Sequence, residues 1–251
     1  MKRFLIGVFI ILSASIPLHA IAEPLTVSYF ERPPYYFTSK AGIAEGFLVE
    51  RTKKILQTAN IDAQFLSLTP NKINYIIRYA ATPHCSIGWF KTPERELFAK
   101  FTKPIYQNKP LVLLTTREKQ KQLNNGKTLA QIFSNKELVF ARMGSFSYGA
   151  YVDQLLEKLT PRSQFYSKRQ TDLLLSLHTN QASYMLAAPE EIQQMIIAAE
   201  LPEDEFVSIT LEEIPHGNFR YLMCGHAVSD PLIEQLNSAI KKLFPPQETV
   251  L

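Results

Sequence analysis

Apolar residues follow two periods along the first third of the chain, one typical of strands and one typical of amphipathic helices. Because the two kinds of segment alternate, the pattern predicts a βαβαβ order and hence a parallel sheet covered by helices. The first strand ends at Glu31-Arg32-Pro33-Pro34, because proline cannot donate to a central sheet ladder. The predicted strands are 25–30, 62–68 and 85–90, and the predicted helices are 47–59 and 71–81.

A second set of strands and helices is predicted after residue 110. Between the two sets, Thr92 can cap a helix that begins at Pro93, which places Arg95 in the first turn, close to the end of strand 85–90. The charged stretch 116–126 is interpreted as solvated surface. The remaining predicted strands are 111–115, 138–142, 183–187 and 219–224, and the remaining helices are 148–159, 171–178, 190–199 and 230–243.

The N-terminus is typical of a secretory signal peptide over residues 1–22. Lys2 and Arg3 precede an apolar run, and Ala20-Ile21-Ala22 offers the small residues at which a signal peptidase cleaves. An uncleaved membrane anchor is the alternative, but polar residues interrupt the run before it reaches the roughly 20 apolar residues that span a bilayer. Cleavage after Ala22 removes two of the 27 basic residues and none of the 23 acidic ones, so the formal charge falls from +4 to +2.

Composition places the chain among ordinary globular proteins, with 46% apolar and 20% charged residues over 251 positions. The small net charge argues against a nucleic-acid binder, which concentrates Lys and Arg on one face. Cys85 and Cys224 are the two cysteines, and with five histidines they form no metal-binding spacing, so we expect neither a metal nor a cofactor. In an oxidising compartment the two cysteines either form a disulfide or stay as small buried thiols.

Six short segments, spread in order from residue 27 to residue 231, carry a family resemblance. They are Val27-Ser28-Tyr29-Phe30 with Pro33-Pro34-Tyr35, Gly46-Phe47, Thr92-Pro93-Glu94-Arg95, Phe101-Thr102-Lys103-Pro104-Ile105-Tyr106, Gly144-Ser145, and the strand before Asp230-Pro231. In this order they resemble the extracellular solute-binding proteins of family 3, the polar amino-acid type. A cysteine before the Thr-Pro-Glu-Arg motif, together with the segment Arg220-Tyr221-Leu222-Met223-Cys224, is similar to a divergent subgroup of that family.

The resemblance implies an α/β fold, the two-lobed type II periplasmic-binding fold. Each lobe would be a mixed, mostly parallel sheet flanked by helices, and two strands would form the hinge. Lobe 1 would comprise residues 24–112 and 217–251, and lobe 2 residues 113–216. The fold also implies that the strands bearing Cys85 and Cys224 are antiparallel neighbours within disulfide reach, so we expect a Cys85–Cys224 bond.

The resemblance also implies a clamp for a carboxylate. In amino-acid-binding members the arginine of the Thr-Pro-Glu-Arg motif pairs with the ligand α-carboxylate, and Arg95 matches it; a surface ion pair is the alternative for this residue. Gly144 and Ser145 match a second contact, where backbone N–H groups at a helix N-terminus meet the same carboxylate.

One departure from the family pattern concerns the ligand ammonium. Alanine stands where lobe 2 of the family has an aspartate, and Glu190 or Glu191 are the possible substitutes. Favourable interaction with the helix dipole explains two glutamates at a helix start equally well.

A second departure concerns the size of the ligand. Trp89 and Phe90 stand where amino-acid binders have small hydroxyl residues; core packing is the alternative, and strand alternation turns one of the two inward. Together with Arg32, Tyr35 and Tyr36 of the first loop, they predict a bulkier or flatter ligand that bears a carboxylate.

These observations predict a periplasmic solute-binding protein, not an enzyme, that closes on its ligand and delivers it to a transporter or a sensor. We expect a monomer whose partner is an inner-membrane ABC permease or sensor, with no nucleic acid involved. The alternative is a periplasmic lyase on the same fold, similar to cyclohexadienyl dehydratases, with Glu31, Glu190 or His216 as acid–base candidates. A third reading is a receptor module that contacts a membrane sensor without transporting anything.

Overall fold

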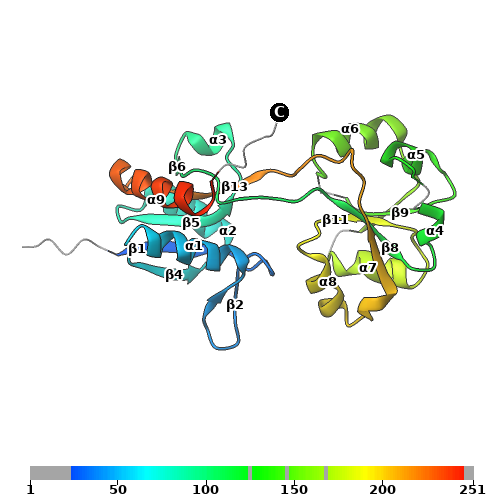
Figure 1. The fold of residues 1–251 in the computed structure, drawn as a ribbon, viewed down its shortest axis with the longest axis horizontal. Coiled ribbons are helices and arrows are strands. Elements are labelled where there is room, and N and C mark those ends of the chain that lie inside the picture. Colours follow the sequence, from blue (N-terminus) through cyan, green and yellow to red (C-terminus); the bar gives the residue numbers. More distant parts are fainter. Residues whose placement is uncertain (1–23, 124–125, 145–146, 167–168, 246–251) are drawn as a thin grey trace, which may run out of the picture.

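The chain forms two lobes joined by two connecting segments, as Figure 1 shows. The computed structural model describes residues 24–123, 126–144, 147–166 and 169–245. The predicted signal peptide (1–22) and Ser145 lie outside the described residues. The two-lobed α/β architecture confirms the fold expected from the sequence, whereas the lobe boundaries at 112/113 and 216/217 stay predictions.

Within the described residues, lobe 1 is built on a six-stranded sheet with the order β4-β1-β5-β13-β6, and β7 also pairs with β13. β1 runs parallel to β4 and β5, which confirms the predicted parallel unit, while β13 runs antiparallel to β5. A small hairpin of β2 and β3 follows the first loop. The strands are β1 (Leu25–Tyr29), β2 (Phe37–Thr38), β3 (Ala44–Glu45), β4 (Ala63–Ser67), β5 (His84–Trp89), β6 (Lys100–Phe101), β7 (Tyr106–Gln107) and β13 (Phe219–Cys224).

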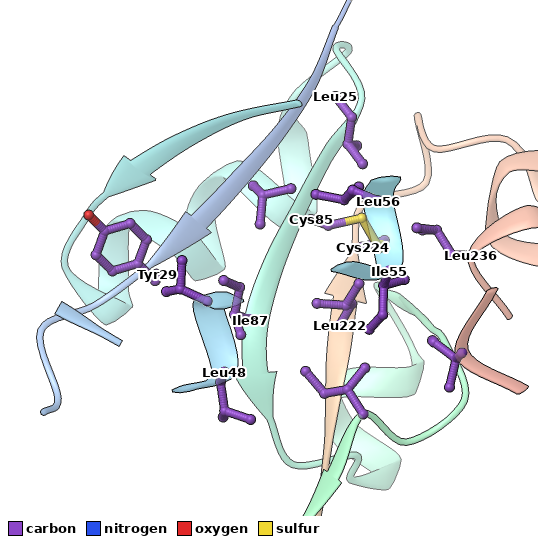
Figure 2. Close-up of a cluster of buried hydrophobic side chains, with 14 of the residues drawn as sticks. Leu25, Tyr29, Leu48, Ile55, Leu56, Cys85, Ile87, Leu222, Cys224 and Leu236 are labelled. Atoms are coloured by element: carbon purple, nitrogen blue, oxygen red, sulfur yellow. A yellow bond between two sulfur atoms is a disulfide. The ribbon is translucent and has the colours of Figure 1, made fainter. Parts of the chain in front are cut away.

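Helices pack their apolar faces onto this sheet. Leu48 and Ile55 of α1 and Leu236 of α9 belong to one buried cluster with Ile87 and Leu222 of the central strands (Figure 2). Three of the helices begin in the way that the sequence signals, with a threonine or serine cap followed by proline at the first or second helical position. The lobe 1 helices are α1 (Phe47–Thr58), α2 (Pro70–Tyr79), α3 (Pro93–Glu96) and α9 (Asp230–Leu243).

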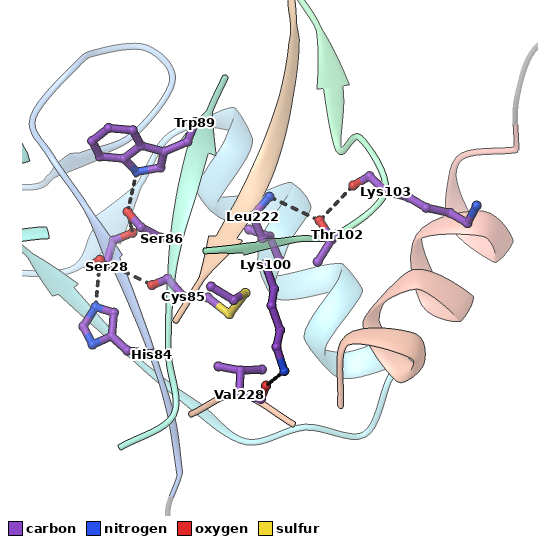
Figure 3. Close-up of a disulfide and its surroundings, with 11 residues drawn as sticks. Ser28, His84, Cys85, Ser86, Trp89, Lys100, Thr102, Lys103, Leu222 and Val228 are labelled. Carbon is purple, nitrogen blue, oxygen red and sulfur yellow. Dashed lines mark hydrogen bonds between the residues drawn. A yellow bond between two sulfur atoms is a disulfide. The ribbon is translucent and has the colours of Figure 1, made fainter. Parts of the chain in front are cut away.

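A disulfide joins the two central strands of lobe 1. Cys85 of β5 faces Cys224 of β13 in the antiparallel register, their Cα atoms lie 4.0 Å apart, and the sulfur atoms are bonded (Figures 2 and 3). Both residues are fully buried. The expected pairing is therefore confirmed, and the bond closes a loop of 139 residues that contains the whole of lobe 2.

Lobe 2 contains an antiparallel sheet in which β8 lies between β11 and β12, and a parallel pair of β9 and β10. Its core is formed by two buried clusters on the two sides of these strands. The elements are β8 (Val112–Thr116), α4 (Gln120–Leu123), α5 (Leu129–Ser134), β9 (Phe140–Met143), α6 (Ala150–Leu159), β10 (Ser163–Tyr166), α7 (Thr171–His178), β11 (Met185–Ala187), α8 (Ile192–Ala199), the 3₁₀ turn η1 (Glu203–Glu205) and β12 (Phe206–Ile209).

Two sequence interpretations in lobe 2 need correction. The stretch 116–126 is not all solvated surface, because it contains α4, whose Leu123 is 1% exposed and packs in the lobe 2 core. The sequence analysis also missed α5, although Thr128 and Gln131 form a capping box whose residue types are legible in the sequence. Both helices have fewer than two full turns, so they are too short to show a hydrophobic period in the sequence.

A buried polar chain lies beside the disulfide in lobe 1. The Nε2 atom of His84 lies 2.9 Å from Ser28 Oγ, Ser86 Oγ donates to the Ser28 carbonyl, and Trp89 Nε1 donates to Ser86 Oγ at 2.8 Å (Figure 3). His84 is 4% exposed, and burial lowers the pKa of its imidazole below the ordinary value. Lobe 1 therefore holds this histidine in its neutral form.

We expect His84 to make the protein less stable in mild acid. The unfolded chain takes up a proton near pH 6.5 and the folded chain only at lower pH, so stability is lost as the pH falls below about 6.5. Denaturant titrations should show that the free energy of unfolding falls between pH 7 and pH 5. This fall should be up to about 2 kcal/mol smaller in His84→Gln than in the unchanged protein. Parallel pH profiles for the two proteins would contradict this.

Candidate functional site

A cavity of about 710 Å³ lies between the two lobes and is lined by residues of both. Lobe 1 contributes the loop after β1, the residue after β5 and the beginning of β13. Lobe 2 contributes the N-terminal part of α6 and the segment between β11 and α8. The volume falls within the range of about 300–1,000 Å³ that small-molecule sites occupy.

The two connecting segments of Figure 1 also line the cavity, and they are hydrogen-bonded to each other. The Asn108 N–H donates to the carbonyl of Asn218, and the Gly217 N–H donates to the carbonyl of Asn108, at 3.2 and 3.0 Å. Few residues connect the lobes at this point, so this paired segment is where a change in lobe orientation would be absorbed.

Arg32 connects the lobes across one edge of the cavity. It follows β1 in a tight turn, in which the Arg32 N–H donates to the carbonyl of Tyr36 at 2.8 Å. Its Nη2 and Nε atoms lie 2.7 and 2.9 Å from Oε1 of Glu191, which is buried at the N-terminus of α8 in lobe 2. Although burial disfavours the charged guanidinium, the Glu191 carboxylate outweighs this and raises the pKa of Arg32.

Glu190, the neighbour of Glu191, contacts the hinge rather than lining the cavity. Its Oε1 accepts hydrogen bonds from the hydroxyl of Tyr106 and from the N–H of Lys109. Burial and this carboxylate raise the pKa of Tyr106, so its hydroxyl stays protonated and donates. Through their Oε1 atoms the two glutamates therefore hold lobe 2 against the loop and the hinge of lobe 1, and a role for either toward a ligand ammonium stays a prediction.

Trp89 and Phe90 face opposite ways, as strand alternation requires. Trp89 is buried in a small core cluster with Ile73 and Ile77 of α2, and it does not line the cavity. Phe90 lines the cavity. In the first loop, Tyr35 and Tyr36 are both buried in the lobe 1 core, and of the two Tyr35 also lines the cavity.

Arg95 lies next to the cavity but is not one of the residues that line it. Its Nη1 donates to the carbonyl of Phe90 at 2.7 Å, and its guanidinium lies 4.8 Å from the centre of the Trp89 ring. Burial lowers the pKa of Arg95, against the opposing effect of the Glu94 charge. Its role as the carboxylate clamp stays a prediction.

The predicted Gly144–Ser145 contact is only partly within the described residues. Gly144 follows β9, and its N–H donates to the carbonyl of Tyr166 at 3.0 Å, so this donor is already occupied. Further along the same segment, Gly149 to Val152 line the cavity at the N-terminus of α6. The first backbone N–H groups of a helix have no intrahelical acceptor, so lobe 2 presents donors to the cavity at this helix start, while the contact expected at Gly144 and Ser145 stays a prediction.

The sequence analysis missed Arg220 as a site residue. Arg220 is the second residue of β13, is 3% exposed, and lines the cavity. Its Nε donates to Asn108 Oδ1 at 2.7 Å and its Nη1 to the carbonyl of Gly88 at 2.9 Å. The one available signal was an arginine inside an otherwise apolar predicted strand, which is unusual unless the charge has a partner or a use.

The acid–base candidates of the lyase alternative are dispersed. Glu31 accepts from Thr38 and Ser67 and is not one of the cavity residues, and these hydrogen bonds outweigh its burial to lower the pKa of its carboxyl group. Glu190 is engaged at the hinge, as described above, whereas His216 lines the cavity. Within the described ranges, no group of three or more His, Cys, Asp or Glu side chains is arranged to hold a metal ion. In the same part of the chain, no helix combines the length and the apolar character needed to cross a bilayer.

No protein-family model and no curated protein matches the chain. Solved structures, by contrast, match nearly all of it at low identity. A substrate-binding domain of Streptococcus pneumoniae, assigned to an amino acid ABC transporter, shares 12% identity with a TM-score of 0.68, and the match covers 88% of this chain and 93% of that one. Substrate-binding domain 2 of Lactococcus lactis GlnP, in its open conformation, shares 14% identity with a TM-score of 0.67, over 89% and 90%.

A third solved structure is an ancestral amino-acid-binding protein described as a precursor of cyclohexadienyl dehydratase. It shares 15% identity with a TM-score of 0.55, and the match covers 88% of each chain. At these identities the matches show the fold, which is the two-lobed fold of solute-binding domains.

Proposed function

We propose, starting from the two-lobed fold that this chain shares with amino-acid-binding domains, that it is a periplasmic solute-binding protein. The ligand is a small carboxylate-bearing molecule, and the protein delivers it to an ABC permease or a sensor in the inner membrane. The interlobe cavity supports this proposal, because a molecule that contacts both walls stabilises the closed arrangement of the lobes.

The charge of the cavity lining is the observation that carries the ligand class. Arg32, Lys109 and Arg220 contribute three cations and Glu191 one carboxylate, so the lining has a formal net charge of +2 with His216 neutral. Glu191 is already paired with Arg32, which leaves a cationic surplus facing the cavity. The N-terminus of α6 adds the positive end of a helix dipole from lobe 2. An anionic ligand is the chemical complement of this surface.

A ligand screen by thermal unfolding tests this proposal. The probes are acid and amide pairs of equal size: glutarate and glutaramide, L-glutamate and L-glutamine, and phenylacetate and phenylacetamide, with L-arginine added. At about 100 times its Kd, an acid that binds should add about 2.7 kcal/mol of stability, which raises Tm by about 5–10 °C for a chain of this size. If no probe changes Tm, the proposal of a small-carboxylate binder is contradicted.

The lyase alternative is distinguished by turnover. Glu31 and Glu190 are engaged in other hydrogen bonds, and His216 on its own supplies one acid–base group to the cavity. A prephenate-like acid incubated with the protein should therefore be recovered unchanged. Release of water and a new unsaturated product at a rate proportional to protein concentration would favour the enzyme.

A further inference from the structure

We infer that Arg220, rather than Arg95, is the residue that receives the anionic group of the ligand, and that the cavity therefore selects acids over their neutral amides. This inference rests on the proposed function and names the group in the cavity that performs recognition. Arg220 lies at the beginning of β13, which is the last strand of lobe 1 along the chain.

Arg220 is a buried charge without an ion-pair partner among the described residues. It is 3% exposed, and none of the salt bridges among the described residues includes it. A buried cation is costly unless it is paired or hydrogen-bonded. Two neutral oxygen acceptors, Asn108 Oδ1 and the Gly88 carbonyl, hold two of its nitrogens and fix its orientation without neutralising it.

The residues around Arg220 keep its guanidinium in place for a ligand. Its central carbon lies 4.5 Å from the ring centre of Tyr35 and 4.7 Å from that of Phe90, and all three residues line the cavity. Aromatic contacts of this kind favour a cation and restrict its rotamers. A guanidinium that is already immobile loses little entropy when a carboxylate pairs with it through two parallel hydrogen bonds.

Tyr35 supplies a second, independent polar atom beside Arg220. The hydroxyl of Tyr35 is buried and has no hydrogen-bond partner among the described residues, although such groups are nearly always satisfied in folded proteins. Burial, with Glu191 and Glu190 nearby, raises the pKa of Tyr35, so the hydroxyl carries its proton. A ligand oxygen bound at Arg220 would supply an acceptor in the same part of the cavity.

Arg95 lacks the same combination of features. It is half-buried, it is not one of the residues that line the cavity, and its Nη1 donates to the Phe90 carbonyl. The two arginines therefore make opposite predictions about which substitution abolishes binding, and each serves as the matched control for the other.

The experiment measures binding of glutarate and glutaramide to the protein expressed from the full chain, by isothermal titration calorimetry. We expect the Kd of glutarate to rise at least about 30-fold in Arg220→Gln, which loses the charge, and in Arg220→Lys, which loses the bidentate guanidinium. In Arg95→Gln the Kd should change less than about 3-fold. The Tyr35→Phe variant should keep the Tm of the unliganded protein and weaken glutarate binding about 5- to 10-fold. Glutaramide should bind none of these proteins measurably.

Each outcome bears on the inference. Retained glutarate binding in a folded Arg220→Lys or Arg220→Gln protein, with loss in Arg95→Gln, overturns it and restores Arg95 as the clamp. Equal affinity for glutarate and glutaramide overturns the selection of acids, while leaving the proposed binding role intact. If Arg220→Gln does not fold, the Lys and Tyr35→Phe variants decide the matter. Failure of glutarate and of every other acid in the screen counts against the proposed function and the inference together.

Discussion

Breaking the Cys85–Cys224 disulfide is expected to lower the free energy of unfolding by about 3–5 kcal/mol. The bond closes a loop of 139 residues, and in the chain-entropy model a loop of that size restricts the unfolded chain by an amount worth about 5 kcal/mol. Both cysteines are fully buried in the central strands of lobe 1, so the surrounding structure cannot readily adjust when the disulfide is broken. Denaturant titrations with and without a reductant measure the difference directly.

The reduced protein is the appropriate comparison because it keeps both sulfur atoms and therefore isolates the cross-link from packing. A Cys85→Ala/Cys224→Ala double variant should lose somewhat more, since it also removes two buried atoms from the core. Coincident unfolding curves for the oxidised and reduced protein would show that the disulfide does not contribute to stability.

The second large effect is expected from Gly46→Ala. Gly46 precedes α1 with φ 114° and ψ 151°, a conformation that residues other than glycine essentially never adopt. A Cβ atom there would lie 2.5 Å from the carbonyl oxygen of Tyr35 and 2.8 Å from the Cα atom of Tyr36. Because both neighbours are backbone atoms, neither can rotate away, and we expect a loss of about 3–5 kcal/mol in the free energy of unfolding.

Gly42→Ala is the matched control for this substitution. Gly42 also has a positive φ, of 76°, but a Cβ atom there would meet no atom within 4 Å. Its expected cost is therefore the backbone strain alone, about 1–2 kcal/mol. Similar losses in the two variants would mean that the contact with the Tyr35–Tyr36 backbone is not what excludes a side chain at Gly46.

Gly46 also connects the stability of the fold to the site. The first N–H groups of α1 donate to the carbonyls of Pro34 and Tyr35, so this close approach holds the loop that carries Arg32 and Tyr35. The Gly46-Phe47 pair was one of the segments that suggested the fold from the sequence. In the structure, glycine is needed at this position because the backbone at Gly46 packs directly against the backbone of Tyr35 and Tyr36.

The candidate site shows where reasoning from the sequence was sufficient and where it was not. Phe90 and Tyr35 were predicted to line the site, and strand alternation separated Phe90 from the buried Trp89. Arg220 was missed because its partners, Asn108, Gly88 and the Tyr35 ring, lie 112 or more residues away along the chain. No local period or spacing encodes such a contact.

Local sequence patterns were enough to predict the four longest strands and the longer helices of lobe 1, the parallel βαβαβ unit and the capped start of α3, because propensity, capping and hydrophobic period act within a few residues. Only the tertiary structure decided that Arg220 lines the cavity and Arg95 does not, how Glu190 and Glu191 are used, and that α4 buries Leu123. The surroundings of these arginines and glutamates depend on β13 returning to lobe 1 after the whole of lobe 2, which places residues from the two ends of the chain around one cavity. The free energy of a charge depends on those distant neighbours, and they are set by the fold and not by the local sequence.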